Sequence, residues 1–118
     1  MEDIYNKFKS RLCCHLNYLV SKNKIKTYAQ VAEHCEIPSP RKIRKLNELI
    51  LDITKEDIKD KKPLRSSLIV SKIEIINGVR VPNEDFFKLL KDQNIYHGKT
   101  DVFSIVKYHK KLLNDLLL

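Results

Sequence analysis

The sequence has no tryptophan and only 2 glycines among its 118 residues. So few glycines argue against a fold built from many tight turns, and against a glycine-rich phosphate-binding loop. An apolar run long enough to span a bilayer is also missing, and the first residues have neither a basic nor an apolar segment. We therefore expect no signal peptide and no contact with a membrane.

Cysteine is scarce too, with 3 residues in no regular arrangement. Cys13 and Cys14 are adjacent and Cys35 stands alone, which is not the spacing of a disulfide framework. An odd number of thiols without such spacing is typical of reduced cysteines. The sequence therefore predicts a cytoplasmic protein.

Positive charge is abundant: the net charge is +8 and the isoelectric point is near 9.4. Such a surface attracts polyanions, which include DNA, RNA and acidic lipid headgroups. Lysine greatly outnumbers arginine, and isoleucine and asparagine are common, a mixture that an AT-rich genome imposes on any protein. The position of the charge along the chain therefore says more about function than its total does. The length predicts one domain, residues 1–118.

Apolar spacing predicts three helices in the first half of the chain. The first covers residues 3–21, where apolar side chains recur three and four positions apart. A second, short helix over 27–35 begins with Thr27 and Gln30, which match a capping box. In the third helix, Ser39 is the expected N-cap and Pro40 suits the first helical position; this helix should end near Thr54.

The second half of the chain contains the one predicted β region, after a charged connection over residues 55–63. Residues 66–82 predict a β-hairpin, in which Leu68-Ile69-Val70 is a buried strand and Asn77-Gly78 a two-residue turn. Two further helices, near 83–92 and 100–117, complete the C-terminal part, residues 83–117. The expected fold class is therefore mainly α with a small β-hairpin.

Residues 27–54 carry the pattern that points to function: a short capped helix, a turn, and a longer helix with a basic start. This is the arrangement of a helix-turn-helix, in which the first helix braces the second and the second presents its N-terminal turns to DNA. Between Lys22 and Lys45 there are seven basic residues against two acidic ones, Glu33 and Glu36. The hairpin that follows would be a wing that holds the flanking backbone.

The predicted interface consists of side chains with separate roles. Arg41, Lys42, Arg44 and Lys45 are expected to enter the major groove, because arginine and lysine bind phosphates and base edges. Thr27 and Ser39 would contact phosphate, and Lys72 and Arg80 would hold the flank from the wing. The full set of predicted DNA-binding residues is Thr27, Tyr28, Gln30, Ser39, Arg41, Lys42, Arg44, Lys45, Lys72 and Arg80.

A short motif adds a resemblance to this interpretation. Thr27-Tyr28-Ala29-Gln30-Val31-Ala32 resembles the Thr-Tyr-Gly-Gln-Val-Ala that opens the helix-turn-helix of the alkylguanine-DNA alkyltransferase C-terminal domain and of alkyltransferase-like proteins. The stretch 27–87 is also similar to a set of small bacterial proteins, through Pro63-Leu64, Leu68-Ile69-Val70, Gly78 and Pro82 with Phe86-Phe87. The resemblance implies a winged-helix fold and DNA contact through the helix that starts at Arg41.

The chemistry of that family is not implied. The alkyltransferases need a Pro-Cys-His-Arg motif, and alkyltransferase-like proteins keep its His-Arg. The matching region here is Pro63-Leu64-Arg65-Ser66-Ser67-Leu68, which has neither cysteine nor histidine. Without the alkyl-accepting thiolate we expect no methyl transfer.

Other chemistry is weaker in the sequence. Soft ligands for zinc are present in Cys13, Cys14, His15, His34 and Cys35. Adjacent cysteines on a helix point about 100° apart, however, so packed thiols and surface histidines are expected instead of a metal site. No histidine is paired with a cysteine as a nucleophile, and His97 and His109 read as surface residues. We therefore predict no enzyme, no catalytic residue, no cofactor and no small-molecule substrate.

The apolar last helix leaves the choice of partner open. It can pack on the domain itself, form a homodimer that reads two half-sites, or meet another protein. The sequence-based hypothesis is a protein that binds double-stranded DNA, as a transcriptional regulator. Its rival is a protein-protein interaction module that uses the winged-helix scaffold and the C-terminal helix, and an enzyme of undetected type is the third alternative.

Overall fold

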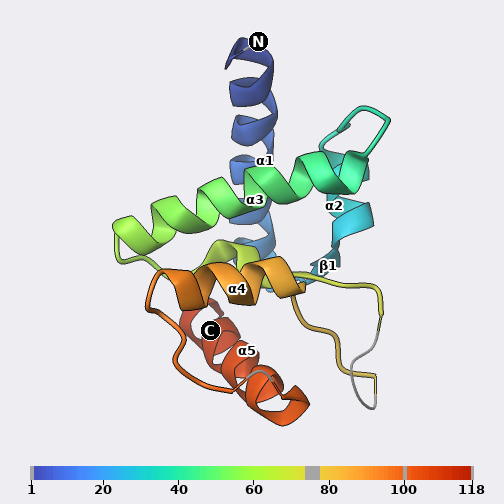
Figure 1. Ribbon diagram of the computed structural model, residues 1–118. Helices are drawn as coiled ribbons and strands as arrows, with labels where there is room; N and C mark the ends of the chain where they lie inside the picture. The colour runs from blue at the N-terminus through green and yellow to red at the C-terminus, as the bar shows by residue number, and fades with distance from the viewer. Residues whose placement is uncertain (1, 74–77, 100, 118) are drawn as a thin grey trace.

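A computed structural model describes residues 2–73, 78–99 and 101–117, and most of them are helical (Figure 1). The elements in chain order are α1 (Glu2–Lys22), β1 (Lys26–Thr27), α2 (Tyr28–His34), α3 (Lys42–Lys59), the 3-10 helix η1 (Arg65–Leu68), β2 (Ile69–Val70), α4 (Glu84–Asp92) and α5 (Val102–Leu116). The prediction of a mainly helical chain with a small β region is confirmed. Among the described residues, no helix is both long and apolar enough to cross a bilayer.

The β region differs from the expected hairpin in two ways. Its two strands, β1 and β2, pair in parallel with Lys26 opposite Ile69. The sequence did not indicate β1. Leu68, predicted in a strand, belongs to η1 instead, and in this 3-10 turn the hydroxyl of Ser67 donates to the carbonyl of Leu64 at 2.7 Å. Ile69 and Val70 do form a buried strand, as predicted.

The predicted turn falls partly outside the described residues, which omit 74–77. Gly78 has φ +79°, a conformation that favours glycine. The backbone N–H of Ser71 donates to the carbonyl of Val81 at 2.9 Å, so the chain returns beside itself after the turn region. We call residues 71–73 and 78–81 the paired arms; Figure 1 draws them as a long loop that stands away from the helices.

The first core lies where α1, α2 and α3 meet η1 and β2. Helical spacing places one apolar stripe of each helix there, and the capped start of α2 fixes its direction. The fully buried side chains of this core include Leu12, Leu16, Leu19, Val31, Leu46, Ile50, Ile53, Leu68 and Ile69. The helix pair α2–α3 is therefore braced from behind by α1.

A second core joins α4 and α5 to the chain around them. Its buried residues are Leu64, Val81, Phe86, Phe87, Leu90, Tyr96 and Leu112. Leu113 and Leu116 on α5, with Leu117 directly after it, also pack against the first core, so the last helix is held by its own chain. One large apolar residue of this helix, Phe103, stays 73% exposed.

The bounds of α3 correct the sequence prediction at both ends. The helix begins at Lys42, and its N-cap residue is Arg41 and not Ser39. It ends at Lys59 and not near Thr54, since the buried Asp57 and the half-buried Ile58 continue its inward side, while Lys55, Glu56 and Lys59 stay exposed. Asp57 is buried four positions after Ile53, because Arg65 pairs with its carboxylate, at 2.9 Å from Nη2 to Oδ1.

Buried polar groups fix the η1 segment between the two cores. Arg65 donates from its backbone N–H and Nε to Asp57, at 3.2 and 3.1 Å. The hydroxyls of Thr54 and Ser66 lie 2.6 Å apart, and His109 Nε2 lies 2.8 Å from the carbonyl oxygen of Ser67. His109 was expected at the surface but is buried, and burial lowers its pKa, so the neutral ring serves as a structural donor.

Candidate nucleic-acid interface

The capping box predicted for α2 is present. Thr27 Oγ1 accepts from the N–H of Gln30 at 3.2 Å, and Gln30 Oε1 accepts from the N–H of Thr27 at 2.9 Å. The inward face of α2 buries Val31, Ala32 and Cys35 against the first core, as the sequence predicted. The start of α2 is therefore a fixed point from which the rest of the helix pair is positioned.

The turn between α2 and α3 leaves the start of α3 uncapped by a side chain. Arg41 has left-handed backbone angles, φ 60° and ψ 42°, and makes no side-chain capping bond. The first backbone hydrogen bond of the helix runs from the N–H of Lys45 to the carbonyl of Arg41 at 3.0 Å. The free N–H groups of the first turn give this end of the helix a partial positive charge.

Four cationic side chains surround this helix start, and all four are exposed: Arg41, Lys42, Arg44 and Lys45. Lys45 Nζ also donates to the carbonyl of Pro38 at 3.2 Å, which ties the turn to the first helical turn. The ion pairs among the described residues are Lys9–Glu56, Arg11–Glu36 and Arg65–Asp57. None of the four cations is neutralised within that part of the chain.

A second group of cations lies where β1 meets the paired arms. An open cleft of about 330 Å³ is lined by Ile25, Lys26, Thr27, Gln30, Val70, Gly78 and Arg80. It brings together two cations, Lys26 and Arg80, from positions 54 residues apart (80 − 26), and none of the described residues that line it is acidic. Lys26 was not among the predicted interface residues; the strand β1, which the sequence did not reveal, places it there.

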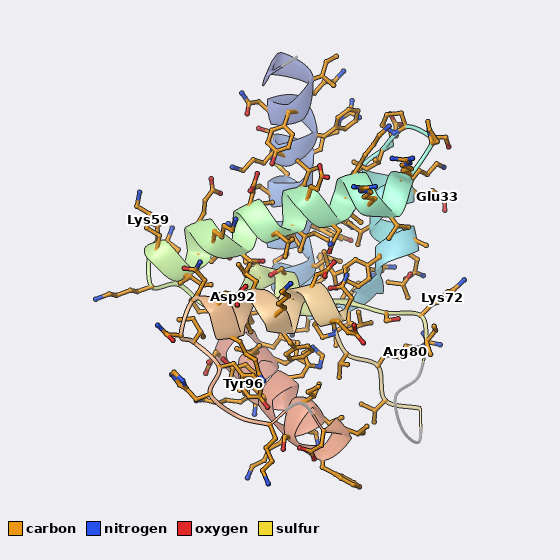
Figure 2. All side chains as sticks on the ribbon, viewed as in Figure 1. Glu33, Lys59, Lys72, Arg80, Asp92 and Tyr96 are labelled. Atoms are coloured by element: carbon orange, nitrogen blue, oxygen red, sulfur yellow. The ribbon has the colours of Figure 1, made fainter. Side chains whose placement is uncertain are left out.

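The positions of the two predicted arm residues can be followed in the figures. Lys72 and Arg80 are both exposed, and Figure 2 labels both on the paired arms. Figure 1 draws the turn before α3, α2, β1 and the arms along the same side of the molecule. The two cationic groups are therefore separated by α2.

Tyr28 does not lie at this surface. It is 7% exposed, and its hydroxyl accepts from the N–H of Asn83 at 3.0 Å, which joins α2 to the start of α4. Burial raises the pKa of Tyr28 to about 12. Tyr28 was predicted to bind DNA, but its role in the Thr27–Ala32 motif is structural, because the ring packs in the first core. Ser39 is exposed in the turn, and Gln30 is exposed while its side chain caps α2.

Acidic residues also lie near the start of α3. Glu36 lies in the turn, and its Oε2 is 3.5 Å from Nη1 of Arg11 on α1. Glu33 is exposed on α2, and Figure 2 labels it beside the start of α3. The exposed Glu48 of α3 lines a hollow together with Lys45 and Pro38, so Glu33, Glu36 and Glu48 all lie beside the cations of this face.

Comparison with known proteins found no protein family, no curated protein and no solved structure that matches this chain. The functional argument therefore depends on the residues and their geometry. Within the described ranges, no three histidine, cysteine or carboxylate side chains are grouped closely enough to hold a metal ion.

Proposed function

We propose that this chain is a winged helix-turn-helix protein that binds double-stranded DNA and acts as a transcriptional regulator. The observation that carries the proposal is the exposure of Arg41, Lys42, Arg44 and Lys45 around the uncapped start of α3. Arginine and lysine on a helix end of this kind suit both phosphates and the acceptor atoms of guanine.

In this proposal α3 enters the major groove by its N-terminal turns. Arg41 and Arg44 contact base edges, while the free N–H groups and the lysines contact phosphate. The paired arms are the wing, and Lys26, Lys72 and Arg80 contact the flanking backbone. The parallel pairing of β1 with β2 supports this arrangement, because it ties the base of the wing to the start of α2.

A second candidate function is protein-protein interaction through α5. It is favoured by Phe103, which is 73% exposed in a helix whose other large apolar side chains are at least partly buried. An apolar side chain of this size on the surface is a common feature of protein interfaces. The two functions predict different responses to salt.

The first test is a binding titration of a labelled random-sequence duplex, followed by fluorescence anisotropy at several salt concentrations. If the five cations assigned to the backbone, Lys26, Lys42, Lys45, Lys72 and Arg80, each neutralise a phosphate, the plot of log K against log salt has a slope of about −4.5. Equal titrations of a single strand and of duplex RNA should give weaker binding. A flat salt response, or no binding to the DNA duplex at low salt, would refute the proposal and favour the protein interface.

A further inference from the structure

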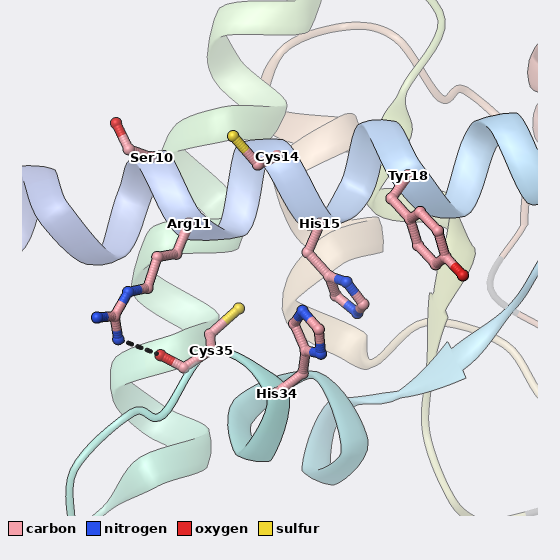
Figure 3. A pocket seen from close by; sticks show the side chains of 7 residues that line it. All are labelled: Ser10, Arg11, Cys14, His15, Tyr18, His34 and Cys35. Atoms are coloured by element: carbon pink, nitrogen blue, oxygen red, sulfur yellow. Dashed lines mark hydrogen bonds between the residues drawn. The ribbon is translucent and has the colours of Figure 1, made fainter.

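Two histidines meet in a groove between α1 and α2. The rings of His15 on α1 and His34 on α2 have centroids 3.8 Å apart and planes 18° apart, so they are stacked. Figure 3 shows the pair in the middle of the groove, with Arg11 at one end and Tyr18 at the other. Because His34 is the last residue of α2, the stack lies just before the turn that leads to α3.

The two rings differ in their access to water. His15 is 7% exposed, whereas His34 belongs to the exposed residues. An exposed ring stays hydrated when it is charged, and the dipole at the C-terminal end of a helix favours a cation there. Burial lowers the pKa of His15, and the neighbouring His34 and Lys26 lower it further. The first proton that the pair takes up therefore goes to His34.

The groups around the pair supply no negative charge for a second proton. None of the described residues that line the groove is acidic. Glu36 lies 3.5 Å from Nη1 of Arg11, at the end of the groove, and Glu33 precedes His34 on α2 without lining it. The other titratable and charged groups around the pair are Arg11, Cys14 and Tyr18 from α1, Lys26 from β1 and Cys35 after α2.

The neighbours of the pair also keep the groove from becoming more negative. Arg11 is held in place as a cation, because its Nη1 donates to the carbonyl of Cys35 at 3.2 Å and its guanidinium lies over the ring of Phe8. Burial raises the pKa of the Cys35 thiol, so this side chain stays neutral. A second proton in the pair is therefore opposed by cations alone.

Protonation of both rings would place two positive charges in stacking contact. At the observed 3.8 Å, their repulsion in water lowers the affinity for the second proton at least about fivefold, and partial burial strengthens the effect. The sign for stability follows from the lowered pKa of His15, because the unfolded chain binds this proton more readily than the folded one. The contribution of the pair to stability is complete above the ordinary value of 6.5 and is lost as the pH falls below it.

We propose that His15 and His34 form an acid-sensitive contact between α1 and α2, which is closed while at most one ring is protonated and opens when both are. Opening loosens the last turn of α2 from α1, and with it the chain that enters the turn before α3. The inference does not depend on the proposed DNA function, since it uses none of the cations at the start of α3.

The test is an acid titration of the full chain, observed through the ring NMR signals of His15 and His34. The native chain should show two steps, His34 first, and the nuclear Overhauser contact between the rings should disappear in the second. His34→Phe keeps a flat ring over His15 but carries no charge, so His15 should take up its proton at an at least about fivefold lower proton concentration, with the ring contact retained. His97→Phe, at an exposed histidine outside the groove, is the matched control and should leave both steps unchanged.

Amide hydrogen exchange shows whether α2 itself loosens or only the His34 side chain turns away. After correction for the intrinsic pH dependence of exchange, protection of the α2 amides should fall at least about fivefold in acid relative to those of α4, and less in His34→Phe. His34→Gln, also without charge, gives the same shift of His15 if the larger ring of Phe disturbs the fold. The proposal is overturned if His15 titrates unchanged in both variants, if the rings stay in contact when both are protonated, or if protection of α2 does not fall.

Discussion

At the scale of residues, Asp57 is the one buried charged side chain of α3, and its partner is Arg65 of η1. Asp57 is 1% exposed and receives three donors from Arg65, two from the guanidinium and one from the backbone. Arg65 Nη1 also donates to Asn17 on α1, at 3.1 Å. This arginine therefore joins α3, η1 and α1, and its side chain is not available for a ligand.

We expect Arg65→Met to destabilise the fold by about 3 kcal/mol, because it leaves a buried carboxylate without a cation. The matched control is Lys9→Met, which removes the more exposed ion pair between Lys9 on α1 and Glu56 on α3. This substitution should lower the free energy of unfolding by less than about 1 kcal/mol. Urea unfolding of the three chains measures both values. Equal losses in the two variants would show that Asp57 is hydrated and that the pair does not organise the core.

At the scale of elements, local signals in the sequence predicted helices better than their limits. The capping box at Thr27 and Gln30 set the start of α2 correctly, because both partners lie within one turn. Ser39 and Pro40 carried an equally good local signal for the start of α3. Both residues lie instead in the turn before the helix, where the carbonyl of Pro38 accepts from Lys45 Nζ. The sequence predicted Asp57 in a loop because its partner, Arg65, lies beyond the helix. A tertiary ion pair of this kind leaves no local pattern in the sequence.

Substitutions at Thr27 and Ser39 test this difference between a true and a false capping signal directly. Thr27→Ala should destabilise the chain by about 1 kcal/mol, since it leaves the N–H of Gln30 without an acceptor. Ser39→Ala should change stability by less than about 0.5 kcal/mol, because this hydroxyl caps nothing. Thermal unfolding of both variants is sufficient. A larger loss for Ser39→Ala would mean that the helix starts where the sequence alone suggests.

At the scale of the whole molecule, the charge and the aromatic groups lie on different surfaces. The cations that the sequence singled out are exposed at the start of α3 and on the paired arms, and Lys26 joins them through a strand that only the structure reveals. His15 and His34 were expected at the surface; His34 is exposed, but His15 is 7% exposed and stacked on it. Residues 19 apart in sequence (34 − 15) meet there because α2 packs on α1, which no short motif encodes.

The account of α3 as the DNA-reading element depends most directly on one comparison. Arg41→Ala with Arg44→Ala removes two exposed cations from the start of α3, and Lys110→Ala with Lys111→Ala removes two exposed cations from α5. Both double variants lower the net charge equally, and neither alters a buried side chain. In the anisotropy titration at one fixed salt concentration, the arginine variant should lose duplex affinity at least about a hundredfold, and the lysine variant less than about fivefold. Equal losses in the two variants, or full affinity in the arginine variant, would contradict the account.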